Sequence, residues 1–134
     1  MAENGLITLP SAHDVGTTLG RLTEALDAKG VTIFARIDHA AGAAGVGLPL
    51  RPTTLVIFGN PVAGTPLMQV AQTAGIDLPL KVLVWQGLDG HTYLTYNDLS
   101  WIAARHGLGG EAQQAVNALG TAVAAIAQHA TSAQ

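Results

Sequence analysis

Short aliphatic segments between residues 53 and 106 alternate with clusters of turn-forming residues, and this pattern limits the possible folds more than any other feature. The strand-like segments are Thr53–Phe58, Leu80–Trp85 and His91–Tyr96. Gly87-Leu88-Asp89-Gly90 separates the last two and predicts a hairpin. Asn60-Pro61 predicts a turn, because the residue before a proline is pushed out of the helical region. The middle of the chain therefore predicts a sheet that contains antiparallel neighbours.

Both flanks of this stretch carry further strands and helices. Apolar residues recur at helical spacing in two places, at Val15, Leu19, Leu22 and Leu26, and at Val116, Leu119, Val123 and Ile126. The second stripe predicts a C-terminal helix over Glu111–His129. Leu6–Leu9 is a short strand, and Val31–Ile37 alternates so that Val31, Ile33, Ala35 and Ile37 are expected on one face. This order predicts an α+β fold, a two-layer, mostly antiparallel sheet of about five strands with helices on one face.

Smaller elements connect the strands. Residues 38–52 are small and Gly-rich, lack a phosphate-binding signature, and predict a tight loop or a short helix. Thr65 and Pro66 predict the start of a helix that ends at Gly75, because proline is well tolerated at a first helical position. Asn97 or Asp98 is expected to cap a short helix that runs to His106 and stops at Gly107.

Composition restricts the functional classes. The 134 residues fit a single domain, and only 11% are charged, against a usual level of about 25%. So few charges predict that part of the surface is buried in a homodimer. The net charge is −3 and the six basic residues are scattered, which argues against nucleic acid. There are no cysteines, and no apolar run approaches the roughly 20 residues that span a bilayer, so we expect a cytoplasmic protein without membrane contact.

Several blocks together carry a resemblance to a known family. They are Arg36–Ala41, Leu55–Pro61, Gly64–Gln69, Leu78–Trp85 and Tyr96–Asp98, continuing through Arg105-His106. About residues 12–108 thereby resemble the domain of unknown function 302 (DUF302) family, and the C-terminal helix lies largely outside this pattern. The resemblance implies a two-layer fold similar to that of the TATA-binding protein, usually assembled as a homodimer, and no established activity. One departure is Asp98-Leu99, where the family tends to place a proline after the acidic residue.

Polar residues at two strand ends are the main site candidates. His39 follows Asp38 directly, and an imidazole beside a carboxylate can act as a general base or a ligand. Tyr96, Asn97 and Asp98 offer a phenol, an amide and a carboxylate where a strand meets a helix, a junction that suits polar or anionic ligands. If the connection between the second and fifth strands makes them parallel, His39 and Tyr96 lie at the same edge of the sheet.

Each candidate also has a structural interpretation. Asn97 and Asp98 are suitable helix caps, Asn60 suits an Asn-Pro turn, and His39 can hydrogen-bond the Gly-rich loop. Arg105 is expected to lie on the Trp101 ring, four residues earlier, and His106 to face inward. Met68 with His39 could ligate a soft metal or haem, but methionine at this spacing is more typical of packing. No metal-site motif is present, so we expect neither a metal nor a cofactor.

Three functional hypotheses follow. The first is a homodimeric domain that binds a small polar or anionic ligand through His39, Asn60, Tyr96, Asn97 and Asp98. The second is an enzyme that uses His39 as general acid or base with Tyr96 as its partner. The third is a structural or adaptor module without a ligand site.

Overall fold

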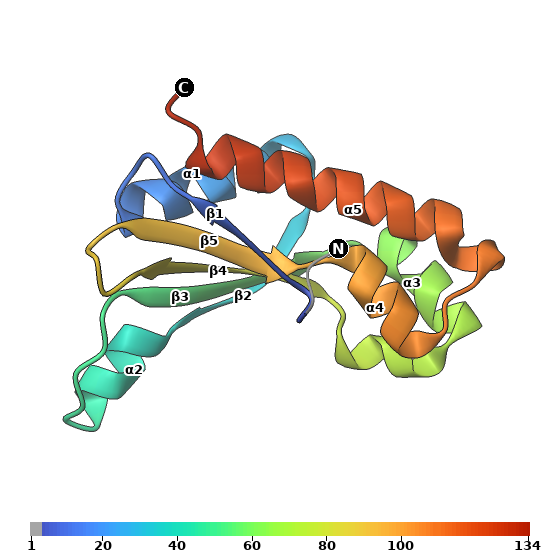
Figure 1. Ribbon diagram of the computed structural model, residues 1–134, viewed down its shortest axis with the longest axis horizontal. Helices are drawn as coiled ribbons and strands as arrows, with labels where there is room; N and C mark the ends of the chain where they lie inside the picture. Colours follow the sequence, from blue (N-terminus) through green and yellow to red (C-terminus); the bar gives the residue numbers. More distant parts are fainter. Residues whose placement is uncertain (1–3) are drawn as a thin grey trace.

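Five strands form one open antiparallel sheet in the computed structural model, which describes residues 4–134 (Figure 1). They are β1 (Leu6–Pro10), β2 (Thr32–Asp38), β3 (Thr53–Gly59), β4 (Leu80–Gln86) and β5 (Thr92–Asn97). Their order across the sheet is β1-β5-β4-β3-β2, and every neighbouring pair is antiparallel. The predicted α+β class and the five-stranded, mostly antiparallel sheet are confirmed.

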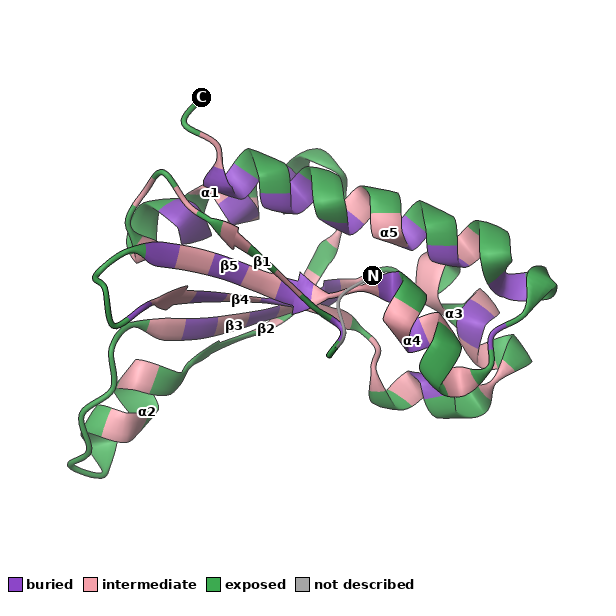
Figure 2. Ribbon diagram, viewed as in Figure 1, coloured by how far each residue is buried: buried purple, intermediate pink, exposed green. Residues whose placement is uncertain are grey.

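Two long helices, α1 (Val15–Ala28) and α5 (Gly110–Thr131), cover one face of the sheet (Figures 1 and 2). In the three central strands, alternate residues point toward these helices and are buried, as the pleat of a strand requires. The inward residues of the three central strands include Val56, Phe58, Val82, Val84 and Leu94. The apolar stripes predicted for both helices, including Leu22, Leu26, Val123 and Ile126, meet them in a single core.

Four shorter elements lie at the two ends of the sheet. They are α2 (His39–Gly45), α3 (Pro61–Val70), the 3₁₀ helix η1 (Gln72–Ile76) and α4 (Leu99–His106). Figure 1 shows α3, η1 and α4 gathered at one end, whereas α2 extends from the opposite end. No residue of α2 is buried, so the short helix that was one option for residues 38–52 exists but contributes little to the core.

The strand β2 departs from the simple alternation predicted for Val31–Ile37. Ile33 pairs with Phe58, yet Ala35 pairs with Ile57, so Phe34 is an extra residue in a β-bulge. The expectation that Ile33 and Ala35 share a face was therefore wrong, because a bulge shifts every later residue to the other face. Phe34 itself remains 52% exposed.

The helix α3 begins one turn earlier than predicted. Asn60 is its N-cap, with the side-chain Oδ1 accepting a hydrogen bond from the Val62 N–H at 2.9 Å. Pro61 takes the first helical position, where its missing N–H costs nothing, so Pro66 lies inside the helix. The helix also ends earlier, because Ala71 adopts an extended conformation before η1 begins.

Side-chain hydrogen bonds begin α1 and α4, and the predicted cap and end of α4 are confirmed. Asp14 caps α1 by accepting from the Thr17 N–H at 2.7 Å, and Asp98 caps α4 by accepting from the Ser100 N–H at 2.9 Å. Gly107 ends α4 with φ at +63°, a left-handed conformation that glycine adopts without a steric penalty.

Candidate functional site

The strand directions separate His39 from Tyr96. The sheet has no parallel pair among the residues that the structure describes, so β2 and β5 run in opposite directions. His39 follows the end of β2, whereas Tyr96 lies near the opposite end of the sheet, where β5 finishes. Two strands lie between β2 and β5, and three interstrand spacings amount to about 14 Å. The condition for a common edge, a parallel arrangement of β2 and β5, is not met, and a proton transfer between His39 and Tyr96 is not supported.

The remaining predicted residues lie nearer one another but do not form one site. Asn60 follows β3 and caps α3, whereas Asn97 ends β5, with β4 between the two strands. Tyr96 is 8% exposed and lies beneath α5, and Asp98 caps α4. Burial raises the pKa of the Tyr96 phenol, and the nearby Asp98 carboxylate adds to this effect.

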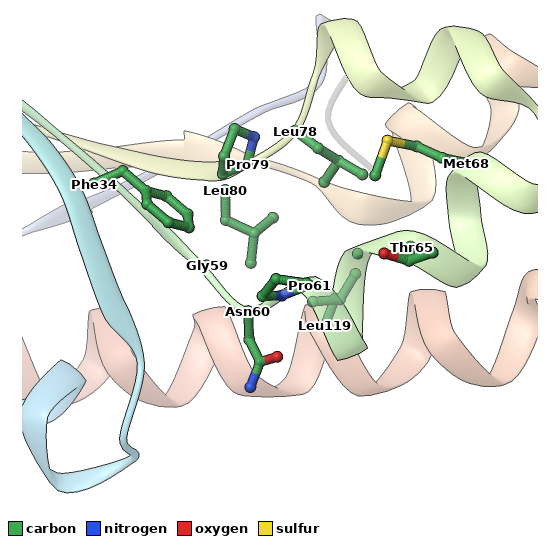
Figure 3. Close-up of a pocket in the computed structure, with 11 residues that line it drawn as sticks. Phe34, Gly59, Asn60, Pro61, Thr65, Met68, Leu78, Pro79, Leu80 and Leu119 are labelled. Atoms are coloured by element: carbon green, nitrogen blue, oxygen red, sulfur yellow. The ribbon is translucent and has the colours of Figure 1, made fainter.

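An apolar pocket of about 250 Å³ opens where β2, β3 and β4 meet α3 and α5 (Figure 3). Its lining residues are Phe34, Gly59, Asn60, Pro61, Gly64, Thr65, Met68, Leu78, Pro79, Leu80 and Leu119. The bulge in β2 brings Phe34 to this pocket, and the long helix contributes Leu119. None of the lining residues is charged, so the pocket is suited to an uncharged group.

Polar groups are few in the apolar pocket. Asn60 uses Oδ1 to cap α3, and Figure 3 shows its side-chain amide pointing away from Phe34 and Met68. Thr65 contributes the only side-chain hydroxyl among the lining residues. A ligand held there would be recognised chiefly by shape, with one hydrogen bond for orientation.

Glycines keep part of the apolar pocket open. A Cβ atom at Gly59 would lie 3.3 Å from Pro79 Cβ and 3.4 Å from Phe34 Cε2, which leaves little spare room. At Gly64, a Cβ would lie 3.7 Å from Leu78 Cδ1, an ordinary contact distance. A larger side chain at residue 64 would therefore be directed toward the pocket wall that Leu78 forms.

A hydrogen-bonded clasp joins η1 to the end of α4. His106 Nε2 lies 2.6 Å from Asp77 Oδ2, and its Nδ1 lies 2.9 Å from Thr73 Oγ1. Arg105 donates to both Asp77 oxygens, at 3.1 and 3.3 Å, with its guanidinium 5.7 Å from the centre of the Trp101 ring. The expected stacking of Arg105 and the inward orientation of His106 are confirmed, since the His106 side chain is 6% exposed.

Met68 and His39 are not brought together, because Met68 lines the apolar pocket and His39 begins α2 at the other end of the sheet. Within residues 4–134, no three His, Asp or Glu side chains are grouped so that they could hold a metal ion. In the same part of the chain, no helix combines the length and the apolar character needed to cross a membrane.

Comparisons with known proteins show which family and which solved structure this chain resembles. The model of the family described as "Domain of unknown function DUF302" matches residues 7–126, and so extends beyond the expected 12–108 into α5. A crystal structure of an uncharacterized conserved DUF302 protein from Bacillus stearothermophilus superposes with a TM-score of 0.83 at 17% identity. That match covers 94% of this chain and 98% of the other, and it shows a shared fold.

Two curated relatives have the name of an ion channel. The "Fluoride-specific ion channel FluC 1" of Brucella suis biovar 1 (strain 1330) is 42% identical over 128 residues, which are 96% of this chain and 50% of that protein. The protein of the same name from Brucella abortus biovar 1 (strain 9-941) is also 42% identical, over 47% of its length. The chain thus spans about half the length of these relatives. Since the family model matches most of its residues, this chain belongs to the DUF302 family.

Proposed function

We propose that this chain is a small-molecule-binding domain whose ligand occupies the apolar pocket. One observation carries the proposal: all of the pocket's lining residues except Phe34 and Leu119 come from the sequence blocks that resemble the DUF302 family. A dry apolar cavity of roughly 150 Å³ is sufficient for benzene. The pocket of about 250 Å³ would therefore suit a somewhat larger ligand.

The lining favours a neutral ligand over the anionic alternative. An anion would lose hydration on entering the pocket, and none of its lining residues supplies a compensating positive charge. The Thr65 hydroxyl offers one hydrogen bond, which fits a ligand with an apolar ring or chain and a single polar group.

Benzyl alcohol and benzoate form a matched pair of probes for this proposal. We expect benzyl alcohol to shift the backbone amide NMR signals of Gly59, Gly64, Thr65 and Leu80, and benzoate to leave them nearly unchanged. Gly64→Leu should abolish the shifts, because the added side chain would occupy the pocket beside Leu78. Two-dimensional NMR titration measures both effects.

Gly20→Leu is the matched control for the Gly64 substitution. Gly20 lies in α1, and a Cβ there would meet no atom within 4 Å, so this variant should bind benzyl alcohol as the unmodified chain does. Equal binding of benzyl alcohol and benzoate would contradict the neutral-ligand proposal. Shifts that persist in Gly64→Leu would show that the probe binds elsewhere.

We further propose that the domain is an accessory to a membrane channel in the Brucella relatives. Their matched half resembles this chain, which supplies no candidate membrane-spanning helix in residues 4–134, so conduction would belong to the unmatched half. A fluoride-efflux assay in liposomes tests this. We expect the Brucella suis protein without its matched half to retain efflux, and this chain alone to produce none; efflux from this chain alone would refute the proposal.

We also propose that the chain forms a homodimer through the face of the sheet opposite α1 and α5. Ile37, Leu55 and Leu83 form a continuous apolar row across three strands on this face, and Ile37 is 40% exposed. Such a row is suited to pairing with a second copy. Sedimentation equilibrium at micromolar concentration should give twice the 13.7 kDa chain mass. The Leu55→Asp variant should give the mass of a single chain. A monomer of the unmodified chain would contradict this assembly.

A further inference from the structure

A polar groove of about 580 Å³ lies between α5 and the junction of β5 with α4. The side chains that give it polarity are those of Tyr96, Asp98, Ser100, Asn117 and Thr121. It is distinct from the apolar pocket, because Leu119 lines the pocket while its neighbour Gly120 lines the groove. The long helix α5 therefore forms a wall of both.

The Tyr96 hydroxyl is the most informative group in the polar groove. The residue is 92% buried, being 8% exposed, and within residues 4–134 its hydroxyl makes no hydrogen bond to the protein. No fully buried side-chain polar atom in that part of the chain lacks a partner, so the hydroxyl is at least partly accessible to solvent, and Tyr96 lines the polar groove. A buried phenol whose hydroxyl is left available in this way is suited to a ligand.

The charge of the polar groove is set by one carboxylate. Asp98 is the only charged residue among its lining residues. Its Oδ1 caps α4 through the Ser100 N–H, which leaves Oδ2 for another donor. The negative charge of Asp98 disfavours an added anion and offers a cation a partner, and the positive N-terminal end of α4 offsets only part of this charge.

The neighbouring side chains can complete a set of acceptors. Ser100 and Thr121 each contribute a hydroxyl, which can accept as well as donate. Asn117 is partly engaged, because its Oδ1 accepts from Gln113 Nε2 at 2.8 Å. The apolar residues Leu99 and Val116 line the same groove and can contact a short hydrocarbon chain.

We propose that the polar groove binds a small primary amine, with the ammonium group held between the Asp98 carboxylate and the Tyr96 hydroxyl. An ammonium group has three N–H donors, and these two acceptors lie two residues apart at one end of β5. The hydrocarbon part of the amine lies along α5, where Gly120 leaves space beside Leu99.

Three probes of equal chain length separate this proposal from its alternatives: n-butylammonium, 1-butanol and butyrate. In NMR titrations at neutral pH, we expect n-butylammonium to shift the amide signals of Ser100, Asn117, Gly120 and Thr121. 1-Butanol should bind about tenfold more weakly, because it lacks the charge-assisted hydrogen bond. Butyrate should cause no shift in the groove.

Asp98→Asn is the sharpest variant, because asparagine also caps helices well and removes only the charge. We expect it to weaken n-butylammonium binding by about tenfold, and Tyr96→Phe to weaken it by several-fold. Asp14→Asn, which makes the same change at the cap of α1, should leave binding unchanged.

Two results would overturn the proposal: no groove shifts with n-butylammonium, or equal binding by Asp98→Asn and the unmodified chain. Equal binding of 1-butanol would also contradict it, and would identify the groove as a site for neutral hydroxyl compounds. Gly64→Leu should leave amine binding intact, so failure of the apolar pocket and failure of the polar groove are distinguishable.

Discussion

Phe58→Ala is expected to lower the free energy of unfolding by about 3–5 kcal/mol. Phe58 is 1% exposed and lies at the inner face of β3, among the largest fully buried side chains of the core. Truncation would remove apolar contacts and leave a cavity that the surrounding helices and strands fill only partly. Because Phe58 directly precedes Gly59 and Asn60, the loss would also loosen one wall of the apolar pocket. Urea denaturation followed by circular dichroism measures the change.

Phe34→Ala provides the matched control, since these are the two phenylalanines of the chain. Phe34 is 52% exposed, and we expect its truncation to cost less than about 1 kcal/mol. Its main effect should be weaker benzyl alcohol binding, because Phe34 lines the apolar pocket. Equal destabilisation by the two substitutions would contradict the placement of Phe34 in an exposed bulge.

Asp77→Ala is expected to destabilise the chain by about 2–3 kcal/mol. The substitution removes the carboxylate that holds both His106 and Arg105, and leaves one buried imidazole nitrogen without its partner. The loss of the clasp should separate η1 from α4 before the rest of the fold opens. Urea denaturation gives the total cost, and amide hydrogen exchange should show faster exchange in η1 and α4 than in β3.

Two further variants accompany Asp77→Ala: one removes only the ion pair with Arg105, and the other is a control at an exposed aspartate. Arg105→Ala should cost less than about 1 kcal/mol, because the Arg105 side chain is 50% exposed and water screens its ion pair. Asp27→Ala, at an exposed position of α1, should change stability by less than about 0.5 kcal/mol. If Arg105→Ala were as costly as Asp77→Ala, the ion pair rather than the His106 hydrogen bond would be the main contribution of the clasp.

Local sequence signals predicted most of the fold. The helices α1 and α5 were recognisable because apolar residues recur at helical spacing, and β4 and β5 because Gly87–Gly90 separates two strand-like segments. Capping by Asp98 and termination at Gly107 follow from side-chain chemistry that acts over a few residues. Such signals depend little on the rest of the chain.

The predictions failed where contacts between distant parts of the chain determine the local structure. The bulge at Phe34 depends on how β2 aligns with β3, which the alternating sequence of β2 alone does not reveal. Pro66 suggested a helix start, but the pair Asn60-Pro61 offered an equally suitable cap and first residue five positions earlier. The strand directions depend on the whole topology, so the sequence left open whether His39 and Tyr96 lie at the same edge of the sheet.

The candidate sites were only partly predictable for the same reason. Asn60, Tyr96 and Asp98 were identified as polar residues at strand ends, and they line the apolar pocket or the polar groove. Phe34, Leu78 and Leu119 were not, because an apolar lining residue has the same sequence signature as a core residue. The glycines at 59 and 64 were the available signal, since each removes a side chain beside the pocket.

A crystal structure of the chain grown with 4-bromobenzyl alcohol would test the apolar pocket most directly. Bromine scatters anomalously, so its position can be located independently of the protein. We predict a bromine peak within the apolar pocket, in contact with Phe34, Met68 or Leu78, and no such peak in crystals of Gly64→Leu. A bromine peak found only outside the pocket, or an empty pocket at saturating ligand, would contradict the proposal that this is where the domain binds its ligand.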